Sequence, residues 1–343
     1  MTPRKTAFAA ALALTVSGAH AQAPQASQTE EAYAARPEVR AFVRDLANRH
    51  AFAEAELLDV FARVKPVDPI LRAISAPADK VRSWQEYRAL FVNDRRIEAG
   101  VAFWNANQAA LERAERQYGI PAEYIVGIIG VETLYGRNTG RWRVIEALST
   151  LAFDHPPRSA FFRDELRQYL LLARDEGLDV FALRGSYAGA FGIPQFMPGS
   201  ARRFAVDFDG DGRIDLSDSA ADAVGSVANY LHRHGWRPGA PVLFPARITG
   251  EGYRAFVDGS VEPRHALSTL LEAGVEPLGM APEQRSKLGV LVELATPDAG
   301  SDFRVGLRNF YVLTRYNRSA FYATAVADLA DAVRQARAQV PGR

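Results

Sequence analysis

The sequence predicts a mainly helical α+β protein with a small β-containing segment toward its C-terminal end. Two observations support this fold class. Apolar residues recur at helical spacing over most of residues 37–234, whereas residues 241–294 mix short extended stretches with Gly/Pro turns. The chain has 343 residues, of which 48% are hydrophobic. It is therefore long enough to bury a substantial core in more than one domain or subdomain.

Residues 1–21 have the pattern of a cleavable secretory signal peptide. Arg4 and Lys5 precede an apolar stretch over residues 7–16, and Ala19-His20-Ala21 matches an A-x-A cleavage site. Cleavage after Ala21 removes the two cations, which lowers the formal net charge from +1 to −1. We therefore expect a periplasmic protein, and we expect no lipid anchor because the chain has no cysteine to acylate.

The composition also excludes some functions. Without cysteine the exported fold has no disulfides, so we expect packing, with a bound metal as a further support, to hold it together. A nearly neutral mature charge gives no electrostatic basis for nucleic-acid binding. We expect a monomer.

The first elements are helical. Residues 22–36 are small and polar and predict a disordered leader. Residues 37–118 predict a helical domain, in which Pro37 begins one helix and Arg95–Tyr118 forms a longer amphipathic one.

Residues 119–240 contain the segment of greatest chemical interest. In Gly119–Gly136 the side chains of Ile125, Ile128, Ile129 and Glu132 follow one helical face. A carboxylate at the end of an apolar face is desolvated, which raises its pKa and suits it to general acid catalysis at a glycosidic oxygen. The alternative is that Glu132 lies at a frayed helix end and points into water.

Further elements follow in order. Helices are expected from about Arg143, over Phe161–Asp175 and over Asp222–His234. Between them, Ser186–Ser200 is rich in small residues and either lets backbone approach a partner closely or forms a tightly packed junction. Residues 241–303 predict a small β-containing subdomain, and residues 304–343 a strand over Arg304–Leu313 followed by a helix over Ser319–Gln339 that together complete the core.

Residues 207–218 read DFDGDGRIDLSD and match an EF-hand-like calcium loop. Oxygen ligands fall at loop positions 1, 3, 5 and 9, with glycine at position 6 and a backbone carbonyl at position 7. Position 12 is Asp in place of the usual Glu, so we expect weaker binding. The expected Ca²⁺ ligands, with a structural role, are Asp207, Asp209, Asp211, Arg213, Asp215 and Asp218. The alternative is an acidic turn in water.

These segments resemble the lytic murein transglycosylases of the membrane-bound lytic transglycosylase B type, in a form without a lipid anchor. The resemblance covers nearly all of the mature chain. It rests on four long motifs: GVETLYG at Gly130–Gly136, GSYAGAFGIPQFMPGS at Gly185–Ser200, the segment Ala205–Trp236 around the acidic loop, and NFYVLTRYNRSAFYATAV at Asn309–Val326.

The resemblance implies a lysozyme-like core at residues 119–240, with the helical domain before it and the small β-containing subdomain after it. It also implies an activity. Such enzymes cleave the β-1,4 bond between N-acetylmuramic acid and N-acetylglucosamine in peptidoglycan glycan strands without water, and the muramyl C6 hydroxyl attacks C1 to leave a 1,6-anhydro end. Glu132 matches the single catalytic acid/base.

The same resemblance assigns substrate-binding residues. Ser186 and Gln195 match polar residues of the sugar subsites, and Tyr230, Tyr316 and Tyr87 match tyrosines around the cleft. Arg158 matches an arginine near the stem peptide, although the neighbouring basic position is a proline here.

Two other functions compete with this one. A lysozyme-like muramidase would use water and needs a second carboxylate, for which Asp154 is the nearest candidate in the sequence. A calcium-stabilised peptidoglycan-binding protein without activity would not need Glu132. A buried acid without a role is costly, which argues against this last alternative.

Overall fold

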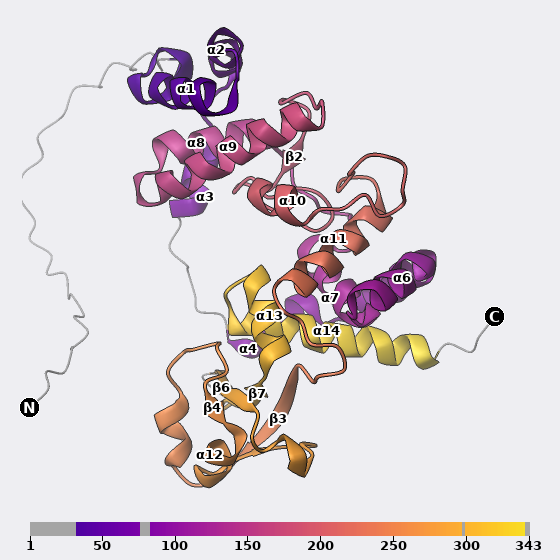
Figure 1. Cartoon of the computed structure of the whole chain (residues 1–343). Helices are drawn as coiled ribbons and strands as arrows, with labels where there is room; N and C mark the ends of the chain where they lie inside the picture. Colours follow the sequence, from indigo (N-terminus) through magenta and orange to yellow (C-terminus); the bar gives the residue numbers. More distant parts are fainter. Residues whose placement is uncertain (1–31, 76–82, 297–298, 340–343) are drawn as a thin grey trace, which may run out of the picture.

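The computed structural model describes residues 32–75, 83–296 and 299–339. The predicted signal peptide and residues 22–31 of the predicted leader lie outside this range. Helices make up most of the described chain, and one small antiparallel sheet lies at one end of it (Figure 1). The mainly helical α+β fold class predicted from the sequence is therefore confirmed.

A first group of helices combines the N-terminal segment with a helical hairpin from the middle of the chain (Figure 1). The hairpin helices pack closely on each other, and the N-terminal helices contact one another and the hairpin. The members are η1 (Tyr33–Ala35), α1 (Pro37–His50), α2 (Glu54–Arg63), α3 (Asp68–Ser75), α8 (Val144–Asp154), η2 (Pro156–Arg158) and α9 (Ser159–Asp175).

A second group is built around the C-terminal helix, which contacts helices from three distant parts of the chain. Its members are α4 (Trp84–Phe91), α5 (Asp94–Ala106), α6 (Gln108–Tyr118), α7 (Ala122–Thr133), α10 (Pro198–Phe204), α11 (Ala220–Arg233), α13 (Arg308–Tyr316) and α14 (Ala320–Gln339). One apolar core runs through both helix groups.

The sheet has the strand order β4-β6-β7-β3-β5, and all neighbouring strands are antiparallel. The strands are β3 (Leu243–Ile248), β4 (His265–Ala266), β5 (Val275–Pro277), β6 (Leu288–Leu294) and β7 (Asp302–Gly306), with α12 (Leu267–Glu272), η3 (Gly252–Phe256) and η4 (Pro282–Gln284) between them. Leu291 pairs with Val305, and both belong to a small apolar cluster of their own with Leu267 and Leu270.

Helix α7 is buried on all sides and not on one face only. Gly127 and Gly130 allow this, because a Cβ at Gly127 would lie 2.8 Å from the Val326 carbonyl oxygen on α14, and one at Gly130 would lie 2.9 Å from Leu329. A helix that is apolar all round belongs in a protein interior. The desolvation expected for Glu132 therefore follows from burial of the whole helix, and not only from the one apolar face that the sequence predicts.

Three sequence predictions are corrected by the structure. The predicted leader 22–36 is ordered over its described part, where Tyr33 is fully buried in η1. The predicted helix Arg95–Tyr118 is two helices, because Asn107 leaves the helical conformation and its side chain donates to the Phe103 carbonyl at 2.8 Å. The predicted strand Arg304–Leu313 ends at Gly306, and α13 follows it.

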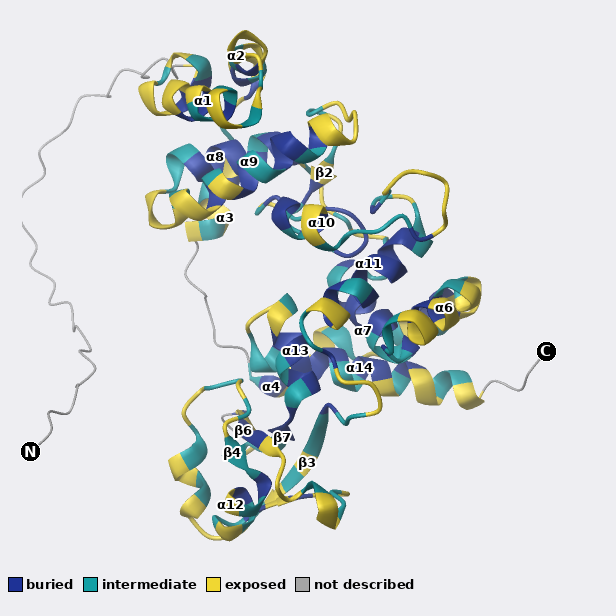
Figure 2. Ribbon diagram, in the orientation of Figure 1, coloured by how far each residue is buried: buried dark blue, intermediate teal, exposed yellow. Residues whose placement is uncertain are grey.

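The exposed faces lie mainly on peripheral helices such as α1 and α6, whereas α8, α11 and α13 are largely buried (Figure 2). Across the described ranges, no helix combines the length and the apolar character needed to cross a bilayer.

Candidate active site

Glu132 lies in the last turn of α7, and its side chain is partly buried. The helix ends directly after it, because Leu134 and Tyr135 both take left-handed backbone angles, with φ of 51° and 60°. Non-glycine residues rarely adopt such angles, and pairs of them are typical of functional sites. The Thr133 hydroxyl donates to the Ile193 carbonyl at 2.8 Å and so fixes this helix end to the 192–196 loop.

The Glu132 side chain opens into a cavity of about 450 Å³. Two segments form its walls, one at residues 137–142 and one in the small-residue stretch that contains Ser186. A short antiparallel pair of strands, β1 (Trp142–Arg143) and β2 (Arg184–Gly185), joins these two segments. The lining residues are Glu132, Arg137, Asn138, Thr139, Gly140, Arg141, Trp142, Ser186, Tyr187 and Gln195.

Close backbone contacts shape these walls. A Cβ at Gly140 would lie 2.1 Å from the Gly185 carbonyl, and a Cβ at Gly185 would lie 2.2 Å from the Ala190 carbonyl. Within the 186–200 segment, a Cβ at Gly192 would lie 2.6 Å from the Leu216 carbonyl oxygen and one at Gly189 would lie 2.5 Å from the Leu148 side chain, so the segment packs closely against protein, as in the second of the two alternatives considered for it.

Burial gives the Glu132 carboxyl group its chemistry. Burial raises the pKa of Glu132 to about 7, although a hydrogen bond from Tyr322 opposes this rise. The Tyr322 hydroxyl donates to Glu132 Oε1 at 2.6 Å. Burial and the nearby Glu132 also hold the pKa of Tyr322 well above its usual range, so its hydroxyl stays protonated as a donor. A carboxyl group with a pKa near 7 can both give and accept a proton at neutral pH.

Ser186 and Gln195, which the sequence placed at the sugar subsites, both line the Glu132 cavity. Gln195 has a φ of 51°, and its side-chain NH₂ donates to the carbonyls of Thr139 and Gly192, both at 2.9 Å. The Ser186 hydroxyl accepts from the Ala190 N–H at 3.1 Å. Gln195 thereby ties the two walls of the cavity together.

Of the three predicted tyrosines, Tyr316 lies beside Glu132, and Tyr230 packs against Tyr316 in the same aromatic cluster. The Tyr316 hydroxyl donates to the Pro194 carbonyl at 2.6 Å, and burial together with nearby Glu132 raises the Tyr316 pKa. The Tyr230 ring lies 4.8 Å from that of Tyr316, and its hydroxyl donates to the Arg315 carbonyl at 2.5 Å. Both hydroxyl groups thus hold backbone carbonyls.

Tyr87 and Arg158 do not line the cavity. Tyr87 lies on α4, where its ring packs against Phe91 and Phe321 at centroid distances of 5.1 and 5.6 Å. Arg158 is exposed in η2, with its guanidinium group over the Phe161 ring at 4.7 Å. Tyr87 nevertheless lies close enough to Tyr322, the hydrogen-bond donor to Glu132, to contribute to the raised pKa of Tyr322.

Asp154, the candidate second carboxylate of a muramidase, belongs to another site. It accepts a hydrogen bond from the Tyr33 hydroxyl and pairs with Arg36 at 2.5 Å. Among the described residues that line the Glu132 cavity, no side chain except Glu132 carries a carboxylate. Asp154 thus holds the N-terminal segment in place through Tyr33 and Arg36, and it is not a second catalytic carboxylate beside Glu132.

Sequence reasoning did not single out Tyr322 or the wall at residues 137–142. Tyr322 lies within the predicted helix Ser319–Gln339, and no helical pattern shows that one ring ends at a carboxylate. In the wall at 137–142, Asn138 and Gly140 follow Gly136 closely and indicate a break between helices. A polar break directly after a candidate acid is the signal that could have indicated a cleft wall.

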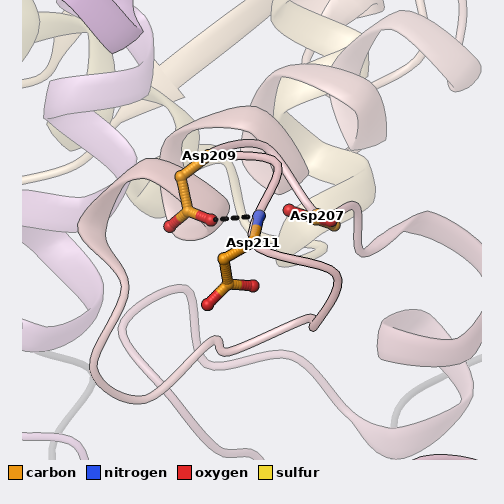
Figure 3. A group of neighbouring side chains, drawn as sticks. All are labelled: Asp207, Asp209 and Asp211. Atoms are coloured by element: carbon orange, nitrogen blue, oxygen red, sulfur yellow. Dashed lines mark hydrogen bonds between the residues drawn. The ribbon is translucent and has the colours of Figure 1, made fainter.

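The acidic loop at residues 207–218 connects α10 to α11; the helix after it was expected, and α10 before it was not. Asp207, Asp209 and Asp211 each supply a carboxylate oxygen, and these atoms all lie within 4.8 Å of one another (Figure 3). Gly210 and Gly212 have φ values of 84° and 88°, which a side chain would strain. The donor set consists of exposed carboxylate oxygens, which fits a hard cation such as Ca²⁺.

The other predicted ligands lie differently. The Asp215 carboxylate accepts from the N–H groups of Ser217 and Asp218, and Asp218 is exposed. The Arg213 N–H donates to the Asp211 carboxylate at 2.8 Å. These three residues do not belong to the three-carboxylate group.

The residue that the sequence reading missed in this region is Asp222. It is buried in the first turn of α11, and its carboxylate accepts from the N–H groups of Phe208 at 2.7 Å and of Asp215 at 2.8 Å. Three residues before it, Ser219 caps the helix by accepting from the Asp222 N–H. Asp222 therefore braces both ends of the acidic loop from inside the fold, and the S-x-x-D spacing is the signal for it.

Comparisons with known proteins agree with this site. Residues 34–331 match the family described as "Transglycosylase SLT domain". The chain is 39% identical over 316 residues to membrane-bound lytic murein transglycosylase B of Escherichia coli strain K12, covering 90% of this chain and 85% of that protein.

Solved structures agree as well. Catenated lytic transglycosylase SltB1 from Pseudomonas aeruginosa matches with a TM-score of 0.85 and 48% identity, over 89% of this chain and 99% of its own. Escherichia coli lytic transglycosylase Slt35, solved in complex with calcium, matches with a TM-score of 0.82 and 40% identity, over 90% and 96% of the two chains. These matches confirm the lysozyme-like core, and they favour an enzyme over an inactive binding protein. The chain thus belongs to the transglycosylase SLT domain family and is a lytic transglycosylase of peptidoglycan.

Proposed function

We propose that the enzyme cleaves the β-1,4 bond between N-acetylmuramic acid and N-acetylglucosamine without water and leaves 1,6-anhydro-N-acetylmuramic acid ends. The observation that carries this proposal is a lone carboxyl group with a pKa of about 7 in a cavity whose described lining holds no second carboxylate. A glycosidase that activates water uses two carboxyl groups, one on each side of the bond.

Glu132 would act twice in the reaction. The protonated carboxyl group first gives its proton to the glycosidic oxygen, and the bond from that oxygen to muramyl C1 breaks. The acetamide group of the substrate stabilises the electron-poor C1. The Glu132 carboxylate then takes the proton of the C6 hydroxyl while that oxygen bonds to C1, which returns Glu132 to its starting state. A hydroxyl group held within the same sugar has a high effective concentration and can outcompete water in this step.

The cavity walls would hold the sugar for this attack. Ser186 and Gln195 reach the cavity from one wall, and Tyr316 and Tyr230 stand behind Glu132. Aromatic rings suit the C–H faces of sugars. Tyr87 and Arg158 stay proposed contacts for more distant parts of the substrate, with Arg158 toward the stem peptide.

The acidic loop would bind one Ca²⁺ ion in a structural role. Asp207, Asp209 and Asp211 would hold it, and the loop is braced by Asp222. The calcium complex of Escherichia coli Slt35 supports this proposal. The two positive charges of the ion would offset most of the repulsion among the three carboxylates.

The substrate would be peptidoglycan glycan strands in the periplasm. The enzyme would be exported to that compartment by the signal peptide at residues 1–21, which is then cleaved. Pseudomonas aeruginosa SltB3, which matches with a TM-score of 0.77 and 29% identity, was solved in complex with NAG-NAM-pentapeptide. This supports a substrate that carries its stem peptide. We propose that the enzyme acts as a monomer without a membrane anchor.

Mass spectrometry of digested sacculi tests the reaction. We expect muramic acid ends in the anhydro form, each lighter by one water than a reducing end. Digestion in ¹⁸O-labelled water is the control, since hydrolysis inserts the label at C1 and the proposed reaction does not. Labelled reducing ends as the main product would replace the proposal by a muramidase.

A further inference from the structure

The end of helix α7 that carries Glu132 is held by two separate parts of the chain. At the cavity, Thr133 fixes it to the 192–196 loop. Away from the cavity it meets α5, where Arg96 donates through Nη1 to the Gly130 carbonyl in the last turn of α7. Because each residue of an α-helix turns the chain by about 100°, Gly130 lies about 200° around the axis from Glu132. The contact with α5 therefore supports the helix end from behind the Glu132 carboxyl group.

The side chain of Tyr135 fills the space between α5 and α7 and does not line the Glu132 cavity. Its ring lies 5.5 Å from that of Phe103 on α5. Its hydroxyl group lies in a notch that two glycines leave open. A Cβ at Gly100 on α5 would lie 2.4 Å from this oxygen, and a Cβ at Gly130 on α7 would lie 2.6 Å from it. The tyrosine therefore fits between the two helices because neither glycine has a side chain.

The backbone turn after Glu132 brings Tyr135 to this place. Tyr135 has a φ of 60°, a left-handed angle that is strained for a side chain of this size. Its amide N–H donates to the Ile129 carbonyl at 3.3 Å, six residues back in the chain. The same turn therefore ends α7 and returns the Tyr135 ring to that helix. Any change in the seat of the ring acts directly on the last turn, which carries Glu132.

The polar atoms of this support are buried without partners. Among the residues that the structure describes, neither the Tyr135 hydroxyl nor Arg96 Nε has a hydrogen-bond partner, and no carboxylate pairs with Arg96. Burial raises the pKa of Tyr135 and lowers that of Arg96, and each group partly offsets the shift of the other, so the two lie close together. Buried polar atoms of this kind destabilise a fold. Packing alone would be served better by apolar side chains, and costly groups of this kind are expected close to functional sites.

We propose that Arg96 and Tyr135 are positioning residues for the reaction, which hold the last turn of α7 so that the Glu132 carboxyl group points into the cavity. The inference rests on the proposed role of Glu132, and it gives neither residue a contact with the substrate. The Tyr135 hydroxyl sets the distance between α5 and this turn, and the Arg96 guanidinium group holds the Gly130 carbonyl. An error of about 1 Å in the place of a reacting group can slow a reaction about 10²-fold. The competing explanation is that both residues only stabilise the fold.

Tyr135→Phe removes one oxygen atom and keeps the ring, so the fold should remain intact. We expect kcat for cleavage of a defined glycan oligomer to fall about tenfold, with KM nearly unchanged, because the walls that hold the sugar keep their contacts. The matched control is Tyr124→Phe in the first turn of the same helix, where the ring packs against Trp236 at 5.1 Å. It should cleave at the wild-type rate. A wild-type kcat in Tyr135→Phe would overturn the proposal.

The pH profile separates positioning from stability. Burial raises the pKa of Glu132 to about 7, and the alkaline limit of activity follows this pKa. When the last turn loosens in Tyr135→Phe, water reaches the carboxyl group and its pKa falls, so this limit should move to lower pH. An unmoved profile, with a lowered unfolding temperature, would show that Tyr135 supports only the fold. The other titratable or charged groups that face Glu132 or its cavity are unchanged in this variant, and they are Tyr322, Tyr316, Arg137, Arg141 and Tyr187.

Arg96→Met tests the second residue, because it removes the guanidinium group and keeps most of the aliphatic chain. It should lower kcat as Tyr135→Phe does, and Arg96→Lys, which keeps a charged donor, should restore part of the rate. Arg95→Met removes a cation from the exposed neighbouring position and is the control. A lysine variant as slow as the methionine variant would overturn the role of the Arg96 donor.

The double variant tests whether the two residues act together. The loss in Tyr135→Phe combined with Arg96→Met should be smaller than the product of the two single losses, because both residues hold the same turn. A loss equal to that product would overturn the joint role. Rates are counted as bonds broken, whichever end group forms, and Glu132→Gln is measured beside them. Wild-type cleavage by Glu132→Gln would reject the proposed function, whereas wild-type cleavage by both positioning variants beside an inactive Glu132→Gln would reject this inference alone.

Discussion

The Glu132 cavity and the acidic loop at residues 207–218 use carboxyl groups in opposite ways. Glu132 stands alone at the end of a helix buried on all sides, and burial raises its pKa to about 7. Asp207, Asp209 and Asp211 stand together in water, on a loop whose glycines leave the backbone free to turn. The first environment gives a carboxyl group that exchanges a proton, and the second gives a set of carboxylates that suits a cation.

The surroundings of an acidic side chain, and not its residue type, decide its chemistry. Asp222 lies between the two cases. It is buried, and the N–H groups of three loop residues, Phe208, Asp209 and Asp215, donate to its carboxylate. Each of the following variants changes one side of the comparison.

The largest effect is expected at the isolated acid. Glu132→Gln removes the proton donor and keeps the shape of the side chain, so turnover of purified sacculi should fall at least ~10²–10⁴-fold. The matched control is Glu123→Gln in the first turn of the same helix, where the carboxyl group is also partly buried but does not line the cavity. It should cleave at nearly the wild-type rate. Wild-type turnover by the Glu132 variant would remove this residue from the mechanism.

The next effect concerns the exposed acids. Calcium should raise the unfolding temperature, because an ion that binds only the folded state at a hundredfold excess over Kd stabilises it by about 2.7 kcal/mol. Calorimetry with calcium and with chelator measures the shift, and Asp209→Ala should abolish it. Asp59→Ala on α2, an exposed acid far from the loop, should leave the shift intact. If chelator changes nothing in the wild type, the loop is an acidic turn only.

The pH dependence of stability should reveal the buried acid without any substrate. The pKa of Glu132 is higher in the folded state, about 7, than its ordinary value of 4.5, so the folded protein holds the proton more tightly. Its contribution is present below pH 4.5 and is lost as the pH rises to 7, which costs about 2 to 3 kcal/mol in the free energy of unfolding. Denaturant unfolding should therefore show Glu132→Gln gaining stability over the wild type between these pH values. Parallel curves for both proteins would contradict the raised pKa.

The smallest effect is expected at the hydrogen bond that reaches Glu132 from α14. Tyr322→Phe removes a donor to the ionised carboxylate, so the pKa of Glu132 should rise further and the alkaline limit of activity should move to higher pH. We expect about a tenfold loss of activity at neutral pH, because the Tyr322 hydroxyl stabilises the carboxylate that Glu132 becomes when it gives its proton to the glycosidic oxygen. Tyr169→Phe, whose hydroxyl donates to the Val180 carbonyl in the first helix group, is the control. An unchanged pH profile would show that Tyr322 does not influence the pKa of Glu132.

Several features of the fold follow from short-range chemistry and were predicted well. Helices α9, α11 and α14 begin and end close to the expected residues, and α1 and α8 begin close to them, because their apolar periodicity is strong. The errors lie where a local competitor decides. At Asn107 a side-chain hydrogen bond breaks a periodic helix, and after Gly306 a short alternating run continues as helix α13 against the core.

The candidate site shows the same division between what a local pattern predicts and what packing decides. Glu132 and the aspartates of the acidic loop can be recognised as candidates from the sequence, because they stand in patterns whose spacing is local, and the resemblance to the family implies Ser186 and Gln195. What surrounds these residues is set by the tertiary structure. It placed Tyr322 on Glu132, 190 residues away in the chain, and it bound Asp154 to Tyr33 and Arg36. The physical reason is that desolvation and hydrogen bonding depend on packing between distant segments, which no local pattern records.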